Sequence, residues 1–299
     1  MNVIDQAILK TVIYADVFDC GISFDELYRK LICTSPVNKD TLEKHLAVLV
    51  SKSILCRKKS FVSLAGHTTA IKRSFNGNTV FKQKMIIARK RLRYAMWLPF
   101  IEGVFITGSL AAKNSDINDD IDVLVVASNY RLWIARMWVV LYSELMTFRK
   151  RPDDIDVKNK LCFNLFLESS SLEIPKDRRS LYTAFEVIQV VPVFTRNNCG
   201  HRFLASNSWI LRYFGNLDIP TINNGYSDYP DFIRIIFTSL SHLFFSQLNY
   251  LLYVIQLWYM RNRKTREFVD LTQAFFHPRK TNVMVMDAYR ARKKRFGLV

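Results

Sequence analysis

Residues 104–126 constrain the fold more than any other stretch of the chain. The apolar run 104–106 reads as a strand, the turn 107–109 (Thr-Gly-Ser) follows it, and the small residues 110–112 can begin a helix. After a polar loop, residues 120–126 (Asp-Ile-Asp-Val-Leu-Val-Val) are rich in β-branched and apolar side chains, which predicts a second strand. The sequence therefore predicts two strands that are joined through a tight turn and a short helix.

Asp120 and Asp122 lie at the start of this second strand. Side chains two apart on a strand point to the same face, so we expect both carboxylates to project together while Ile121 and Val123 point the other way. Neighbouring carboxylates repel each other unless a cation lies between them. Their oxygens suit Mg²⁺, which keeps several waters and takes further ligands from substrate phosphates. The pair therefore predicts a metal site.

The charge of the chain points to an acidic partner. Hydrophobic residues make up 49% and charged residues 23% of the 299 residues, which argues against wholesale disorder, and the length suggests about two domains. The net charge of +17 indicates either a solvated basic surface or binding to nucleic acid, nucleotide or an anionic membrane. Because of the acidic pair, we favour nucleotide and nucleic acid.

Cysteine usage and the N-terminal residues predict a cytoplasmic protein. The five cysteines are scattered and form no CxxC pair, which argues against a disulfide framework and a structural zinc site. Residues 1–6 lack the charged and apolar regions of a signal peptide. Residues 232–260 are rich in Phe, Leu, Ile and Tyr, but polar side chains interrupt them, so we expect a buried or amphipathic helix and no membrane partner.

The first 66 residues show the pattern of a winged helix. Apolar spacing over residues 3–15 predicts one helix, the capping box at residues 23–26 (Ser-Phe-Asp-Glu) opens a second, and residues 40–53 predict a third. Two short strands follow at 54–57 and 61–64 around a basic turn. Three helices followed by a small hairpin are typical of this variant of helix-turn-helix.

In a winged helix the third helix enters the DNA major groove and the wing contacts phosphates. The basic side chains in these places are Lys39, Lys44, His45 and Lys52 on the helix and Arg57, Lys58 and Lys59 on the wing. The helix offers few of the Arg, Asn and Gln side chains that read base edges well. Two interpretations stay open: duplex DNA binding, or a module that contacts proteins or presents a substrate.

A compact α/β unit is expected in the middle of the chain. Residues 67–80 are polar and predict a linker or turn, and residues 81–98 predict a basic helix. Beyond the acidic strand, residues 131–148 predict a long helix with an apolar face, and residues 161–167 predict a third strand. Strands that alternate with helices in this way indicate a sheet with flanking helices.

The glycine turn and the acidic pair together match a known signature. Gly108-Ser109, a gap of ten residues, and Asp120-Ile121-Asp122-Val123 resemble the signature of the DNA polymerase beta-like nucleotidyltransferase superfamily. The whole chain also resembles a group of largely uncharacterised bacterial proteins with a winged helix before this domain. This wider resemblance is carried by residues 14–19, 107–111, 119–122, 131–133, 162–164, 183–189, 207–209 and 276–278.

The resemblance implies a transfer of a nucleotidyl group from an NTP, such as ATP, to an unidentified acceptor. Backbone N–H groups at Gly108 and Ser109 would bind the β- and γ-phosphates, with Lys113 beside them. Asp120 and Asp122 would hold Mg²⁺ or Mn²⁺. A third carboxylate would complete a two-metal site, in which one ion activates the acceptor and the other neutralises the leaving pyrophosphate.

The third carboxylate is where this chain departs from the family pattern. The third strand usually carries it, but the middle of residues 161–167 offers only Asn164. Glu168 at the strand end is our candidate for this catalytic role, and Asp156 is another. Without such a group, the alternative is a winged-helix nucleic-acid-binding protein with a catalytically weak or inactive nucleotidyltransferase-like domain. A third hypothesis is an adaptor that binds or modifies a partner protein.

The expected fold is therefore α+β in three parts. Residues 1–66 would form the winged-helix domain and residues 67–195 a nucleotidyltransferase-like domain with a mixed sheet and flanking helices. Residues 196–299 would form a helical C-terminal region. The helices predicted beyond the third strand span residues 181–191, 203–214, 232–260, 267–276 and 283–295.

Overall fold

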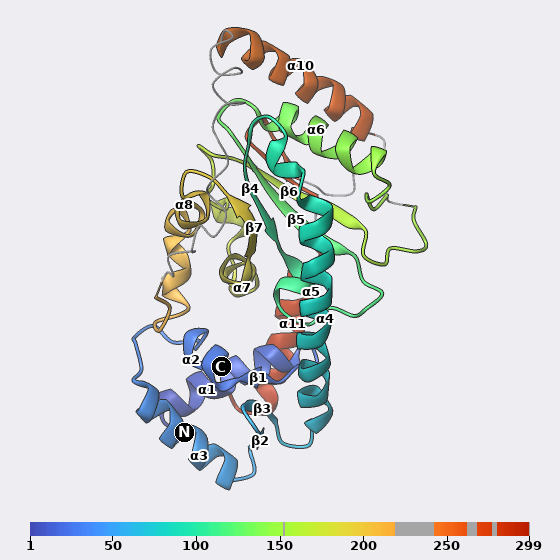
Figure 1. Ribbon diagram of the computed structural model, residues 1–299. Helices are drawn as coiled ribbons and strands as arrows, with labels where there is room; N and C mark the ends of the chain where they lie inside the picture. The colour runs from blue at the N-terminus through green and yellow to red at the C-terminus, as the bar shows by residue number, and fades with distance from the viewer. Residues whose placement is uncertain (152, 219–241, 262–267, 277–279, 299) are drawn as a thin grey trace.

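The residues that the structure describes form two sheets with helices around them (Figure 1). The mixture confirms the predicted α+β class and the mixed central sheet. The computed structural model describes residues 1–151, 153–218, 242–261, 268–276 and 280–298. Two earlier expectations fall partly outside this range: the helix from residue 232, of which the structure describes residues from 242 onwards, and residues 277 and 278 of the resemblance.

The N-terminal module consists of three helices and a small antiparallel sheet of order β1-β3-β2. Its elements are α1 (Val3–Asp16), β1 (Ile22–Ser23), α2 (Phe24–Arg29), α3 (Lys39–Ser51), β2 (Leu55–Lys58) and β3 (Phe61–Leu64). The side chains of Asn2, Ser23 and Asn38 each accept a backbone hydrogen bond at the start of a helix. The three predicted helices and two predicted strands are therefore confirmed.

Helix α4 (Thr68–Leu92) replaces the predicted linker, so that prediction was wrong. It is followed by the short 3₁₀ helix η1 (Ala95–Trp97). Gly77, in the segment predicted as a linker or turn, is buried against the loop after Gly108, and a Cβ there would lie 2.1 Å from the Lys113 carbonyl oxygen. The glycine therefore permits a close approach between this helix and the loop.

The central sheet has the order β7-β4-β5-β6-β9-β8. Its strands are β4 (Ile101–Ile106), β5 (Ile121–Ala127), β6 (Leu161–Glu168), β7 (Val191–Thr195), β8 (Phe268–Val269) and β9 (Gln273–Phe275). Strands β5 and β6 are parallel and α6 (Leu132–Leu145) connects them, while the other described neighbours are antiparallel. The helix predicted at residues 267–276 is wrong, because β8 and β9 extend the sheet beside β6 instead.

Helices cover both faces of the central sheet (Figure 1). Ile121 and Val123 belong to the hydrophobic cluster that contains residues of α4 and α6, whereas Leu124 belongs to the cluster that contains residues of α7 (Leu181–Gln189) and α8 (Cys199–Ser206). The remaining elements are α5 (Gly108–Ala111), η2 (Lys176–Arg178), η3 (Ser208–Arg212), α10 (His242–Arg261) and α11 (Lys280–Arg295). Within the described residues, none of the helices has the length and apolar content needed to cross a bilayer.

The N-terminal module packs against α7 and α11. The ring of Tyr14 stacks on Phe185 with a centroid distance of 3.8 Å and an interplanar angle of 7°. The buried Asp16 accepts a hydrogen bond of 2.9 Å from the Arg292 guanidinium of α11. Core residues of this module and of the α7 layer form one continuous hydrophobic cluster. The module is thus held next to the sheet end that carries the glycine turn and the acidic pair.

Candidate functional site

Gly108 and Asp122 are fitted to each other. Gly108 has φ +63°, a conformation that side chains disfavour, and a Cβ there would lie 2.2 Å from Oδ2 of Asp122. The backbone N–H of Thr107 also donates to the Asp122 carbonyl at 3.0 Å. Only glycine therefore allows the turn to pass directly over this carboxylate. The predicted turn and acidic strand are adjacent in space as well as in sequence.

The acidic pair projects to one face, as the strand alternation predicts. Ligand atoms of Asp120, Asp122 and Cys162 lie within 4.8 Å of one another. The Lys150 ammonium donates to Asp120 at 2.7 Å, and the Asn164 amide donates to Asp122 at 2.5 Å. The arrangement concentrates negative charge at the start of β5, next to the parallel strand β6.

The donor chemistry of this cluster suits a hard divalent cation that uses the two carboxylates. Burial and the two neighbouring carboxylates raise the pKa of the Cys162 thiol, so the sulfur stays protonated and is a poor ligand for Mg²⁺. Burial opposes the charge of Lys150, but its hydrogen bond to Asp120 raises its pKa, so the ammonium stays charged. Asp120 and Asp122 are thus the residues that fit Mg²⁺ or Mn²⁺.

Loop contacts fix the position of Asp120. The buried Lys84 of α4 donates to the Asp119 carbonyl at 2.7 Å and to Ser115 Oγ at 3.2 Å. The Asp119 carboxylate in turn accepts the Asp116 backbone N–H at 2.7 Å. One basic side chain of α4 is therefore structural, and it holds the loop that leads into the acidic strand.

Glu168 does not join this cluster. In the parallel register Cys162 lies opposite Asp122, whereas Glu168 lies opposite Ala127 at the far end of β5. Six residues of extended strand correspond to about 20 Å. The buried Glu168 carboxylate accepts the Tyr130 backbone N–H, and burial raises its pKa. Its contacts are those of a structural group that caps the turn before α6.

Glu186 is a carboxylate that the fold brings to the site although the sequence pattern did not predict it. Glu186 lies on α7, and the Gly108 backbone N–H donates to it. Burial and the charge of Asp122 raise its pKa to about 7. Burial and the same two carboxylates raise the pKa of the neighbouring Tyr182. The sequence feature that could have indicated this residue is an acid between the apolar residues Phe185 and Val187 of a predicted helix.

A cavity of 290 Å³ opens between this site and the N-terminal module. Gly108, Ser109, Asp122 and Glu186 line one side of it, and Lys30 lies on the other. The cavity therefore joins the glycine turn, a half-buried acid and a basic side chain from a different part of the chain.

The predicted nucleotide-binding residue Lys113 lies beside this cavity. Its ammonium is 3.2 Å from the Glu26 carboxylate, and the Lys30 ammonium is 3.7 Å from the same carboxylate. Although burial opposes ionisation of Glu26, the two lysines lower its pKa to about 2. Burial lowers the pKa of Lys30. The N-terminal module thus brings basic groups to the approach of the glycine turn.

Compared with known proteins, the chain matches no protein-family model, no curated protein and no solved structure.

Proposed function

We propose that the protein is a metal-dependent nucleotidyltransferase that moves a nucleotidyl group from an NTP to an acceptor hydroxyl. The observation that carries this proposal is the meeting of Asp122, Glu186 and the Gly108 N–H beside one cavity. The cavity offers backbone and basic groups for phosphates, and Asp122 in its lining lies close to Asp120, the second carboxylate for a cation. These are the elements that phosphate transfer by positioning and charge neutralisation requires.

The residues of the site have separate roles in this proposal. Ser109 and Lys30 bind the phosphates of the NTP at the glycine turn. Asp120 and Asp122 would hold Mg²⁺, which supplies neutralisation of the phosphate charge. The Glu186 carboxylate accepts the proton of the acceptor hydroxyl. The acceptor oxygen then forms a bond to the α-phosphorus, the bond from that phosphorus to the bridging oxygen breaks, and pyrophosphate leaves.

The topology supports the fold assignments that go with this function. Residues 1–66 have the helix and strand order of a winged helix, with the hairpin β2-β3 directly after the third helix. The segment β4-α5-β5 carries the glycine turn and the acidic pair on adjacent strands, as the nucleotidyltransferase signature requires. We therefore assign these two segments to a winged helix and a nucleotidyltransferase-like domain.

The test uses the purified protein with Mg²⁺, each of the four NTPs labelled at the α-phosphate, and small-molecule, RNA and protein fractions as acceptors. We expect label transfer by the wild type and none by the variant that carries both Asp120→Asn and Asp122→Asn. Asp153→Asn, at an exposed acid in the next loop, serves as the control and should transfer normally. Equal transfer by the wild type and the double variant would refute the assignment of the site.

Nucleic-acid binding is a second candidate function, and the structure favours α4 for it over α3. Residues 1–66 contain nine Lys and Arg against seven Asp and Glu, a net charge of +2. The basic groups Lys39 and Arg57 of the expected DNA-binding face contact Asp25 and Glu43. Residues 67–98, by contrast, contain eight Lys and Arg and no acid. Of these two segments, the more positive one is therefore the segment that contains α4, the helix that runs along the side of the molecule (Figure 1).

The end of α4 also presents aromatic rings beside its basic groups. Arg89, Lys90 and Arg93 are exposed, and Tyr94 and Trp97 that follow are 47% and 43% exposed. Basic groups with exposed rings are typical of surfaces that bind single-stranded nucleic acid, because phosphates pair with the charges and bases stack on the rings.

This candidate predicts that a labelled single-stranded RNA binds with a strong salt dependence. Replacing the three basic residues Arg89, Lys90 and Arg93 by Gln should lower the slope of log K against log salt by about 2. The matched triple replacement of Lys44, Lys52 and Lys58 on the N-terminal module should leave that slope unchanged. A wild-type protein that shows no RNA binding at low salt would exclude this function.

A further inference from the structure

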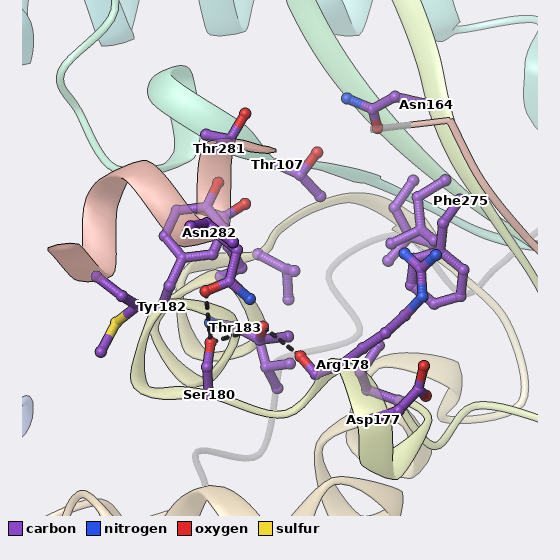
Figure 2. A pocket seen from close by; sticks show the side chains of 18 of the residues that line it. Thr107, Asn164, Asp177, Arg178, Ser180, Tyr182, Thr183, Phe275, Thr281 and Asn282 are labelled. Carbon is purple, nitrogen blue, oxygen red and sulfur yellow. Dashed lines mark hydrogen bonds between the residues drawn. The ribbon is translucent and has the colours of Figure 1, made fainter. Parts of the chain in front are cut away.

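A second cavity of 440 Å³ lies between the central sheet and the helices α7 and α11. Strands β5, β6 and β9 form one wall, and α7 and α11 form the other (Figure 2). Tyr182, Glu186 and Thr281 line both this cavity and the smaller one at the glycine turn. The two cavities therefore meet at the carboxylate that we place beside the reacting groups.

Apolar side chains form most of the walls of the larger cavity. Leu124, Leu165 and Phe275 contribute from the sheet, and Val187 and Phe203 contribute from the helices. Protein interiors are normally close-packed and leave few voids larger than a water molecule. The observed volume lies within the range of roughly 300–1,000 Å³ that small-molecule sites occupy. This space is thus the size of a ligand site rather than of a packing defect.

Polar and charged side chains share the lining of the cavity, among them Asp177, Arg178 and Arg290. Thr107, Asn164 and Glu186 lie at the inner end, where the Asn164 amide also donates to the acidic pair. At the other end, Ser180 donates to Asn282 of α11 at 3.1 Å, and this bond links the two helices of the wall (Figure 2). A ligand that fills the cavity would therefore meet hydrogen-bonding groups at both of these places and apolar surface over most of the wall.

We propose that this cavity binds the acceptor of the transfer reaction, and that the acceptor is a small, largely apolar molecule with a hydroxyl group. The inference rests on the proposed function. The hydroxyl lies at the inner end, gives its proton to Glu186 and forms the new bond to the α-phosphorus as pyrophosphate leaves. A strongly polar acceptor would lose its hydration against the apolar walls without compensation. At the inner end an anionic group would be repelled by the carboxylates, so the end of the acceptor that reacts is a neutral hydroxyl.

The test measures binding of three uncharged alcohols, 2-naphthol, 1-decanol and estradiol, by calorimetry. Val283 on α11 lines the cavity and is 58% exposed, so Val283→Trp fills the entrance with little risk to folding. Met284 is its neighbour, is 69% exposed and does not line the cavity, so Met284→Trp is the matched control. We expect at least one alcohol to bind the wild type and the control. The same alcohol should bind Val283→Trp at least roughly tenfold more weakly, because the indole occupies the volume that the alcohol needs.

Two further measurements separate this inference from the proposed function. ATP with Mg²⁺ should bind together with the alcohol, and competition between them would show that the cavity holds the nucleoside and would overturn the inference. Failure of all three alcohols to bind the wild type, or equal weakening in both Trp variants, would also overturn it. Alcohol binding without any nucleotidyl transfer would instead refute the proposed function and leave the binding site in place.

Discussion

Replacing Glu186 by Gln should stabilise the metal-free protein while it abolishes transfer. Its pKa rises from an ordinary value of 4.5 to about 7, chiefly through burial and then through the charge of Asp122. One pKa unit corresponds to about 1.4 kcal/mol, so ionisation of Glu186 above pH 7 costs the folded state at most about 3 kcal/mol. Solvent reaches the half-buried carboxylate, so we expect a gain of about 1–3 kcal/mol for Glu186→Gln at pH 8.

The pH dependence gives this prediction its sign. Because the folded-state pKa is raised, protonated Glu186 contributes stability that is fully present below pH 4.5 and is lost as the pH rises through about 7. The neutral amide of Gln keeps an oxygen that can accept the Gly108 N–H, and it does not titrate. The two proteins should therefore have similar unfolding free energies near pH 4.5 and diverge between pH 5 and 8.

Urea unfolding in EDTA at pH 5, 6, 7 and 8 measures this difference, with equal m-values as the check that both proteins unfold in the same way. Glu173→Gln, at an exposed carboxylate, is the control and should show no comparable divergence with pH. A wild type that is as stable as Glu186→Gln at pH 8, or more stable, would show that Glu186 is not buried against the acidic pair. Retained transfer activity in the variant would remove its assigned role as the proton acceptor.

Three other substitutions test the packing around the site. Gly108→Ala should destabilise the protein by more than Gly297→Ala in urea unfolding. Both glycines have positive φ, so alanine at either position costs about 1–2 kcal/mol of backbone strain. Only at Gly108 would the added Cβ also meet a carboxylate oxygen, at 2.2 Å. Lys150→Met should raise the Mg²⁺ affinity up to roughly fivefold in calorimetry by removing a competing cation, whereas Lys158→Met should not. Gly77→Ala should lower the melting temperature although alanine favours helices by about 1 kcal/mol, because its Cβ would meet a carbonyl oxygen.

Local patterns predicted the elements whose stability is local. The capping side chain of Ser23 starts its helix as expected, and the alternation along β5 puts Asp122 and Ile121 on opposite faces. The errors come from long-range contacts. Gly77 lies in a polar segment that resembles a turn, but α4 packs there on the loop after the glycine turn. Residues 273–275 become strand β9 because the edge of β6 offers them backbone partners, and β8 pairs with β9 in turn. Neither the packing of α4 on this loop nor the pairing of β9 with β6 can be predicted from the residues of the segment alone.

Long-range contacts also determine which carboxylate lies near Asp122. Sequence order suggested the third strand, but parallel pairing fixes Glu168 at the opposite end of that strand from Asp122. The carboxylate that reaches Asp122 comes from a helix on the sheet face, and α7 brings Glu186 there through the stacking of Phe185 on Tyr14. The position of the acid thus depends on the packing of the N-terminal module. The module is part of the site in this fold, since it supplies a wall of the smaller cavity and packs against α7, the helix that lines both cavities.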